Sequence, residues 1–138
     1  RSGDTNFSKL NDFRKFISLQ NKRCKKIMIQ FKTQIIGAYG SARSGPTLAS
    51  NFGIKDFLDF IFDDHHLKVG KYTSLNGIMV KPTKDLLKIK PAVCVILAYL
   101  HLKKIICKNK EYLSRGGKFL SLYPKANLIT IKNYKKFI

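Results

Sequence analysis

Ile35 to Gly53, with the sequence IIGAYGSARSGPTLASNFG, is the stretch that decides the fold. It begins with apolar residues that predict a buried strand, and it then becomes polar and rich in glycine. Pro46 fits the first turn of a helix, with Ser44 or Gly45 as the N-cap, and Gly53 fits the position just past the helix end. Strand, loop and helix together direct backbone N–H groups and the helix dipole at one point, where a phosphate can bind.

The glycine spacing alone does not name a ligand. Glycines at positions 37, 40 and 45 match neither the dinucleotide fingerprint G-x-G-x-x-G nor the P-loop, which ends in Gly-Lys-Ser/Thr. A tight turn from strand to helix without any ligand accounts for the same spacing. Arg43 places a guanidinium beside this loop, and its fork of donors suits an anionic oxygen group.

Length and composition predict one globular domain. The chain has 138 residues, of which 44% are apolar, so it can bury a core. No apolar run is long enough to span a membrane, and we expect no membrane partner. The chain begins with Arg1 rather than methionine and has no signal-peptide pattern. We therefore expect a cytoplasmic segment of a longer protein.

The charge balance predicts an anionic partner. Basic residues number 27 and acidic residues 8, which gives a formal charge of +19. The lysines are scattered singly or in pairs, however, and the chain has no RNP motif, zinc-finger spacing or basic-region helix. We expect a small phosphate-bearing ligand rather than nucleic acid, and charge-driven nucleic-acid binding is kept as an alternative.

The cysteines and histidines predict no metal site. Cys24, Cys94 and Cys107 lie far apart in apolar surroundings without a C-x-x-C pair, which predicts reduced thiols in the core. His65 and His66 are adjacent, so their side chains point in different directions, and no third ligand is near them in the sequence.

Hydrophobic periodicity predicts strands alternating with helices. Helical spacing runs from Lys9 to Phe31, with Ser8 as the cap, and again from Leu102 to Leu113. A short helix capped by Thr83 lies between them. Apolar runs predict strands that begin near residues 35, 57, 78, 92 and 118, and an edge strand over residues 128–131.

This alternation predicts an α/β fold, a three-layer sandwich with a mostly parallel sheet of about five strands and helices on both faces. Ligands of such folds bind beyond the carboxyl ends of the strands. The glycine loop, Asp63, the Lys68–Tyr72 loop and the Ala98–His101 corner are all expected at that edge. The pair Asp63-Asp64 either holds a ribose or forms a turn or cap, and we favour the second interpretation.

Four blocks in the same order resemble the C-terminal domain of sugar C-methyltransferases. They are residues 37–54, Asp63 with Lys68–Thr73, Ala98–Leu100, and Gly116–Leu120. The first block is similar to the family pattern G-Y-G-A-x-A-[KR]-x-x-T-L-L-N-x-x-G-I. Departures fall at loop and edge positions, such as His66 in place of a usual proline. The resemblance covers about residues 35–124 and implies a Rossmann-like domain.

The resemblance also implies that different parts of the full enzyme bind the substrate and carry out the chemistry. The family's enzymes have an N-terminal zinc-binding segment, a central S-adenosylmethionine domain, and this C-terminal domain, which helps to hold the nucleotide sugar. Residues 1–32 are then expected to be a linker helix from the preceding domain, and residues 33–138 the Rossmann-like domain. S-adenosylmethionine, zinc and the acid–base residues would belong to the other parts. We expect this fragment to bind no cofactor and to contain no catalytic residue.

The ligand implied by the resemblance is a dTDP-sugar or another nucleotide sugar. We expect loop 40–47 to grip its diphosphate with backbone N–H groups and a guanidinium, and loop 68–72 with ammonium groups and an aromatic face. The predicted binding residues are Tyr39, Gly40, Ser41, Arg43, Ser44, Thr47, Lys68, Lys71 and Tyr72. A free-standing Rossmann-like module that binds a dinucleotide through Asp63 is the remaining alternative.

Overall fold

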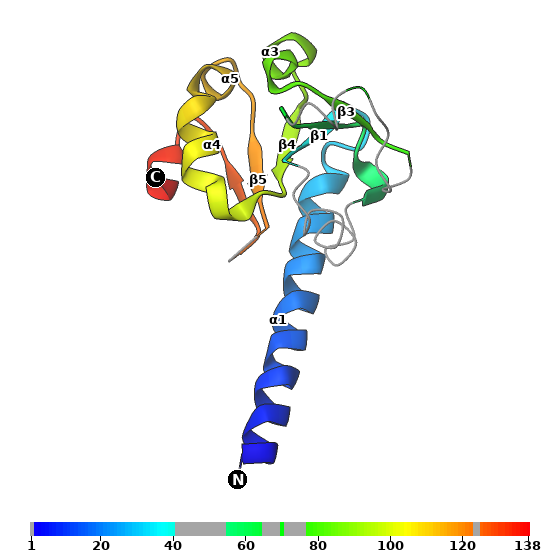
Figure 1. Ribbon diagram of the computed structural model, residues 1–138, viewed down its shortest axis with the longest axis vertical. Helices are drawn as coiled ribbons and strands as arrows, with labels where there is room; N and C mark the ends of the chain where they lie inside the picture. Colours follow the sequence, from blue (N-terminus) through cyan, green and yellow to red (C-terminus); the bar gives the residue numbers. More distant parts are fainter. Residues whose placement is uncertain (1, 41–54, 65–69, 71–76, 123–124) are drawn as a thin grey trace.

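A six-stranded sheet forms the centre of the computed structural model, which describes residues 2–40, 55–64, 70, 77–122 and 125–138 (Figure 1). The strands are β1 (Ile36–Tyr39), β2 (Phe60–Phe62), β3 (Met79–Lys81), β4 (Val93–Ile96), β5 (Phe119–Ser121) and β6 (Asn127–Ile129). They lie in the order β3-β2-β1-β4-β5-β6, and every neighbouring pair is parallel except β5 and β6. The predicted mostly parallel sheet and its edge strand are confirmed, and the order is that of the dinucleotide-binding Rossmann fold.

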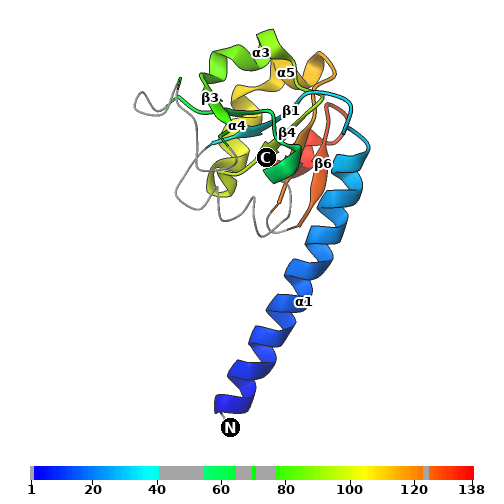
Figure 2. The ribbon, with the colours of Figure 1, turned by 90° about the vertical axis from the view of Figure 1, so that its right-hand side faces the viewer.

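Helical segments alternate with these strands. The α-helices are α1 (Ser2–Ile29), α3 (Leu86–Ile89), α4 (Leu102–Lys108) and α5 (Lys110–Ser114). Single 3-10 turns are η1 (Lys55–Phe57), η2 (Thr83–Asp85), η3 (Tyr99–His101) and η4 (Tyr134–Phe137). Figure 2 shows α1 approaching the sheet from one side, with α3, α4 and α5 on the other.

Side-chain alternation along the strands builds one core on each face of the sheet. On β1, Ile36 and Ala38 join the core that contains Cys24 and Met28 of α1. Tyr39 joins the opposite core, which is covered by α3, α4 and α5. Strand β4 lies between β1 and β5, and its residues are fully buried, as expected for a central strand without charged residues. The predicted helices on both faces are therefore confirmed.

Among the side chains that the structure describes, those of helix α1 that pack on the sheet come from its second half. Cys24 and Met28 are fully buried, and the Gln20 side-chain oxygen accepts a hydrogen bond of 2.7 Å from the backbone N–H of Ala126. The first half extends away from the other described elements in both views (Figures 1 and 2). The prediction that Ser8 caps this helix is wrong. The helix continues to Ser2, since the residues before Ser8 include no proline to stop it.

Two other local predictions need correction. The strand expected from residue 57 begins only at Phe60, because η1 occupies Lys55–Phe57 and the Asp59 carboxylate accepts a hydrogen bond of 2.9 Å from the backbone N–H of Ile36. Thr83 is the first residue of η2 rather than its cap, which is Pro82, and the Thr83 side chain bonds to Asp64.

The helix expected over residues 102–113 is broken at Asn109. The Asn109 side-chain amide donates a hydrogen bond of 2.8 Å to the carbonyl of Ile105, which ends α4, and α5 begins at the next residue. The break still leaves Ile105 and Ile106 buried against the sheet. Cys107 faces outward and is exposed, so the prediction of a core thiol holds for Cys24 and Cys94 and is wrong for Cys107.

Candidate ligand pocket at the carboxyl edge of the sheet

A pocket of about 280 Å³ lies beyond the carboxyl ends of β1, β2 and β4. From β1 the chain adds β2 and β3 towards one edge of the sheet, and it then returns to add β4 on the other side of β1. The order therefore reverses between β1 and β4, and this reversal opens the crevice in which α/β sheets bind ligands. The volume is close to the lower end of the usual range for small-molecule sites, so it suits part of a larger ligand.

The floor of the pocket is apolar and closely packed. Tyr39, Gly40, Phe62, Ala98 and Ile105 line it. The Gly40 N–H donates a hydrogen bond of 2.8 Å to the carbonyl of Phe62, and the Ala98 N–H lies 3.3 Å from the carbonyl of Tyr39. These bonds join the ends of β1, β2 and β4 into one surface.

Gly40 has a conformation that favours glycine. Its φ is +85°, and a Cβ at this position would lie 2.6 Å from the Cβ of Ala98. A side chain at residue 40 would therefore strain the backbone and collide with the end of β4. Because residue 40 has no side chain, the pocket stays open between the ends of β1 and β4.

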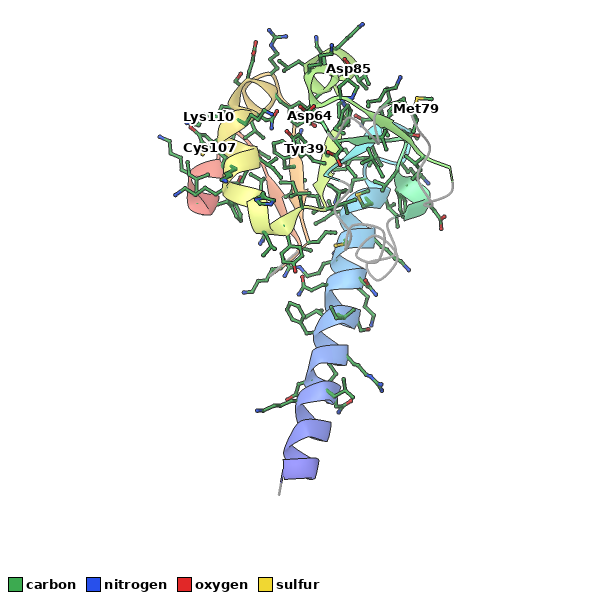
Figure 3. The ribbon with its side chains drawn as sticks, viewed as in Figure 1. Tyr39, Asp64, Met79, Asp85, Cys107 and Lys110 are labelled. Atoms are coloured by element: carbon green, nitrogen blue, oxygen red, sulfur yellow. The ribbon has the colours of Figure 1, made fainter. Side chains whose placement is uncertain are left out.

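One wall of the pocket carries carboxylates from the end of β2. Asp63 and Asp64 both line it, and Figure 3 shows Asp64 in the same central region as Tyr39. One Asp64 oxygen accepts a hydrogen bond of 2.9 Å from the Thr83 N–H, and the other accepts one of 2.5 Å from the Thr83 hydroxyl. Asp64 thus binds the first turn after β3, which agrees with the turn or cap role favoured for this pair.

The environment of Asp64 favours its ionised form. Partial burial alone would raise its pKa, but the hydrogen bonds from Thr83 and the nearby Lys108 ammonium outweigh burial and lower the pKa below its ordinary value. Asp64 is therefore an anion at neutral pH that is already engaged with the protein.

A second wall of the pocket is basic. His101, Lys104 and Lys108 line the pocket from η3 and α4, and the Lys108 ammonium lies 3.4 Å from an Asp64 oxygen. The sequence interpretation placed the Ala98–His101 corner at this edge, and the structure confirms that. It did not single out the two lysines, although their spacing from His101 by three and seven residues was a signal of one shared helix face.

Two of the nine residues predicted to bind the nucleotide sugar can be placed. Tyr39 and Gly40 line the pocket together with Asp63 and Ala98, which were expected at the same edge. The remaining seven, Ser41, Arg43, Ser44, Thr47, Lys68, Lys71 and Tyr72, lie outside the described residues. Their part in the site therefore stays a prediction.

The described residues contain no group of three or more histidine, cysteine or acidic side chains able to hold a metal ion. Cys24 and Cys94 belong to the cores on opposite faces of the sheet. Within the same part of the chain, no helix is both long and apolar enough to cross a membrane.

The strand order and the place of the pocket define a Rossmann-like module with a candidate ligand pocket at the carboxyl edge of its sheet. A family model described as "C-methyltransferase C-terminal domain" matches residues 1–124, which is most of the chain, and the chain belongs to this family. The family resemblance drawn from the glycine loop and the three later blocks is confirmed. A search of curated proteins found no match.

Proposed function

We propose that this chain is the substrate-holding part of a C-methyltransferase that acts on a nucleotide sugar. The pocket at the reversal between β1 and β4 carries this proposal. Its apolar floor suits a sugar ring, its basic wall suits a diphosphate, and family membership supplies the methyl-transfer chemistry. The position of the pocket is the one at which folds of this order bind nucleotides.

Two loops that follow β1 and β2 in the sequence are proposed to complete the binding of the diphosphate. Gly40 lines the pocket and is the first residue of the first loop, and Arg43 follows it three residues later in the sequence. Lys68, Lys71 and Tyr72 of the second loop follow β2 in the chain and supply ammonium groups and an aromatic face. These assignments rest on the family pattern together with the placement of Tyr39 and Gly40.

The chemical steps are assigned to other parts of the full enzyme. S-adenosylmethionine would supply the methyl group once a base had removed the proton next to the sugar keto group. Zinc, like the methyl donor, is assigned by the family resemblance to the other parts of the full enzyme. In this proposal the chain binds and orients the substrate, and the enzyme acts in the cytoplasm.

The first half of α1 is proposed to connect with the preceding domain. It extends away from the sheet, and Leu10 on this half is 49% exposed (Figure 1). Residues 1–32 act in this proposal as a linker helix whose second half is anchored by Cys24 and Met28.

A nicotinamide dinucleotide is the second candidate ligand. The strand order and the acidic residues at the end of β2 are those with which dinucleotide-binding folds hold a ribose. The carboxylate of Asp64 is bonded to Thr83, and in this alternative Asp63 would hold the ribose, as the sequence interpretation has it. Charge-driven nucleic-acid binding would show instead as polyanion binding with a steep dependence on salt.

Calorimetric titration of the chain at fixed salt tests the proposal. We expect a dTDP- or UDP-sugar to bind, and NAD and S-adenosylmethionine to give no heat. A charge-assisted contact contributes about 1.5–3 kcal/mol, so Arg43→Ala should weaken binding by roughly ten- to a hundredfold. Lys22→Ala, which removes an exposed charge on α1, should change little. Equal losses of affinity in the two variants would mean that the positive charge of the chain attracts the ligand nonspecifically, and they would rule out the pocket.

A further inference from the structure

Three basic residues on one helical face line the pocket. His101, Lys104 and Lys108 are separated by three and four residues, a spacing that aligns side chains along one side of η3 and α4. Lys103 and Cys107 are also exposed but do not line the pocket. Figure 3 shows Cys107 on the outer side of α4. The row is therefore a feature of the pocket and is distinct from the general lysine excess of the chain.

Lys108 is held loosely. Its ammonium lies 3.4 Å from Asp64, longer than the 2.7–2.9 Å typical of a charge-assisted hydrogen bond, and the two side chains are 64% and 54% exposed. Thr83 already supplies two hydrogen bonds to the same carboxylate. Lys108 can therefore turn from Asp64 to a ligand while Asp64 stays satisfied.

The two other side chains of the row are available. Among the described residues, neither the His101 imidazole nor the Lys104 ammonium has a hydrogen-bond or ion-pair partner. Both lie beside an apolar floor, where a charge is less screened than on an open surface. An anion at this wall would meet donors that have no competing partner in the described structure.

We propose that His101, Lys104 and Lys108 form a diphosphate-binding row. The row extends about 10 Å along the helix, and Lys104 and Lys108 are about 6 Å apart along it, so their long side chains can converge on two adjacent phosphates. With the diphosphate along α4, the sugar would lie over Tyr39 and Gly40, and its hydroxyl groups would face Asp63. That the ligand is a nucleotide sugar rests on the proposed function; the row itself rests on the geometry of α4.

The row predicts discrimination by phosphate number. A ligand with two phosphates reaches Lys104 and Lys108 together, whereas a monophosphate reaches one of them at a time. We therefore expect dTDP to bind the chain more tightly than dTMP, by about tenfold, and inorganic pyrophosphate to compete with dTDP.

Calorimetry with pyrophosphate, dTDP and dTMP on four proteins tests the row. The proteins are the 138-residue chain and its Lys104→Gln, Lys108→Gln and Lys103→Gln variants. Lys103 is the matched control, since it has the same side chain on the same helix but does not line the pocket. We expect Lys104→Gln and Lys108→Gln each to weaken pyrophosphate and dTDP binding by about tenfold and Lys103→Gln to leave it unchanged. Thermal melting verifies that the variants are folded.

The possible results distinguish a failure of the proposed row from a failure of the proposed function. If pyrophosphate does not bind, or if Lys103→Gln and Lys104→Gln lose affinity equally, the row is overturned. If nucleotide sugars bind and depend on Arg43 but not on Lys104, the row is also overturned while the proposed function stands. If pyrophosphate binding depends on Lys104 and no nucleotide sugar binds, the row is supported and the proposed function fails.

Discussion

The carboxylate of Asp64 accepts hydrogen bonds from both the backbone N–H and the hydroxyl of Thr83, at 2.9 Å and 2.5 Å. This pair joins the end of β2 to the turn that follows β3, across the wall of the pocket. The pocket is thereby held by hydrogen bonds between segments 19 residues apart in the chain.

Removing the Thr83 hydroxyl should weaken this wall. Thr83→Val keeps the shape of the side chain and its backbone N–H but leaves one Asp64 oxygen with only the longer contact to the Lys108 ammonium. We expect the free energy of unfolding to fall by about 1 kcal/mol and the melting temperature to fall by about 4 °C. Thr83→Ser retains the hydroxyl and should melt close to the unmodified chain. Equal melting temperatures for all three proteins would contradict a stabilising role for this bond.

The lowered pKa of Asp64 predicts a pH dependence with a definite sign. A carboxyl group whose pKa is lower in the folded state stabilises the fold at pH values above its ordinary pKa, which is 3.8, and this contribution is lost as the pH falls below that value. Urea unfolding at pH 6 should show the unmodified chain to be more stable than Asp64→Asn. The difference should shrink towards pH 3, and a difference that grows on acidification would disprove the interpretation.

Gly40→Ala should damage the floor of the pocket. The alanine would adopt φ near +85°, which costs about 1–2 kcal/mol, and its Cβ would also meet Ala98 at 2.6 Å. Gly116→Ala is the matched control, because φ there is +91° but no described atom lies within 4 Å of the added Cβ. Chemical denaturation should show a larger loss for Gly40→Ala. Adding Ala98→Gly should recover part of it, and an equal loss in both single variants would exclude the contact as a cause.

The three thiols should differ in reactivity. Burial raises the pKa of Cys24 to about 12 and also raises the pKa of Cys94, whereas Cys107 is exposed on α4. A thiol reagent at pH 8 should therefore modify one cysteine in the native chain and three after denaturation. Cys107→Ser should leave no reactive thiol in the native chain. Rapid native labelling of Cys24 or Cys94 would contradict the burial of these residues in the two cores.

The sheet could be predicted from sequence because its signals are local. The uncharged residues of β4 and the alternation of strands with helices determined the architecture, and the same alternation placed Gly40, Asp63 and Ala98 at one edge. These conclusions depend on the hydrophobic period and on chain direction, and both can be read without tertiary contacts.

The missed features depend on contacts between distant residues or on single side chains. The break at Asn109 results from its side-chain bond to Ile105, within a stretch whose apolar spacing is otherwise helical. Lys104 and Lys108 share a helical spacing with His101, but only the tertiary packing that puts Ile105 in one core with Tyr39 and Phe62 shows that this face lines the pocket. Thr83 was expected to cap its own helix, yet its side chain binds Asp64, which follows β2 in the chain.

Amide chemical shifts during titration with a dTDP-sugar test the central claim most directly, since they report both binding and its place. The account predicts saturable shifts at the amides of Gly40, Asp64, Thr83 and Ala98. It predicts little change at Gly117, which precedes β5 at the opposite edge of the sheet, or at Asn133, which lies on the C-terminal segment. Shifts spread over all exposed lysines, or gathered around Gly117, would contradict a substrate pocket between β1 and β4.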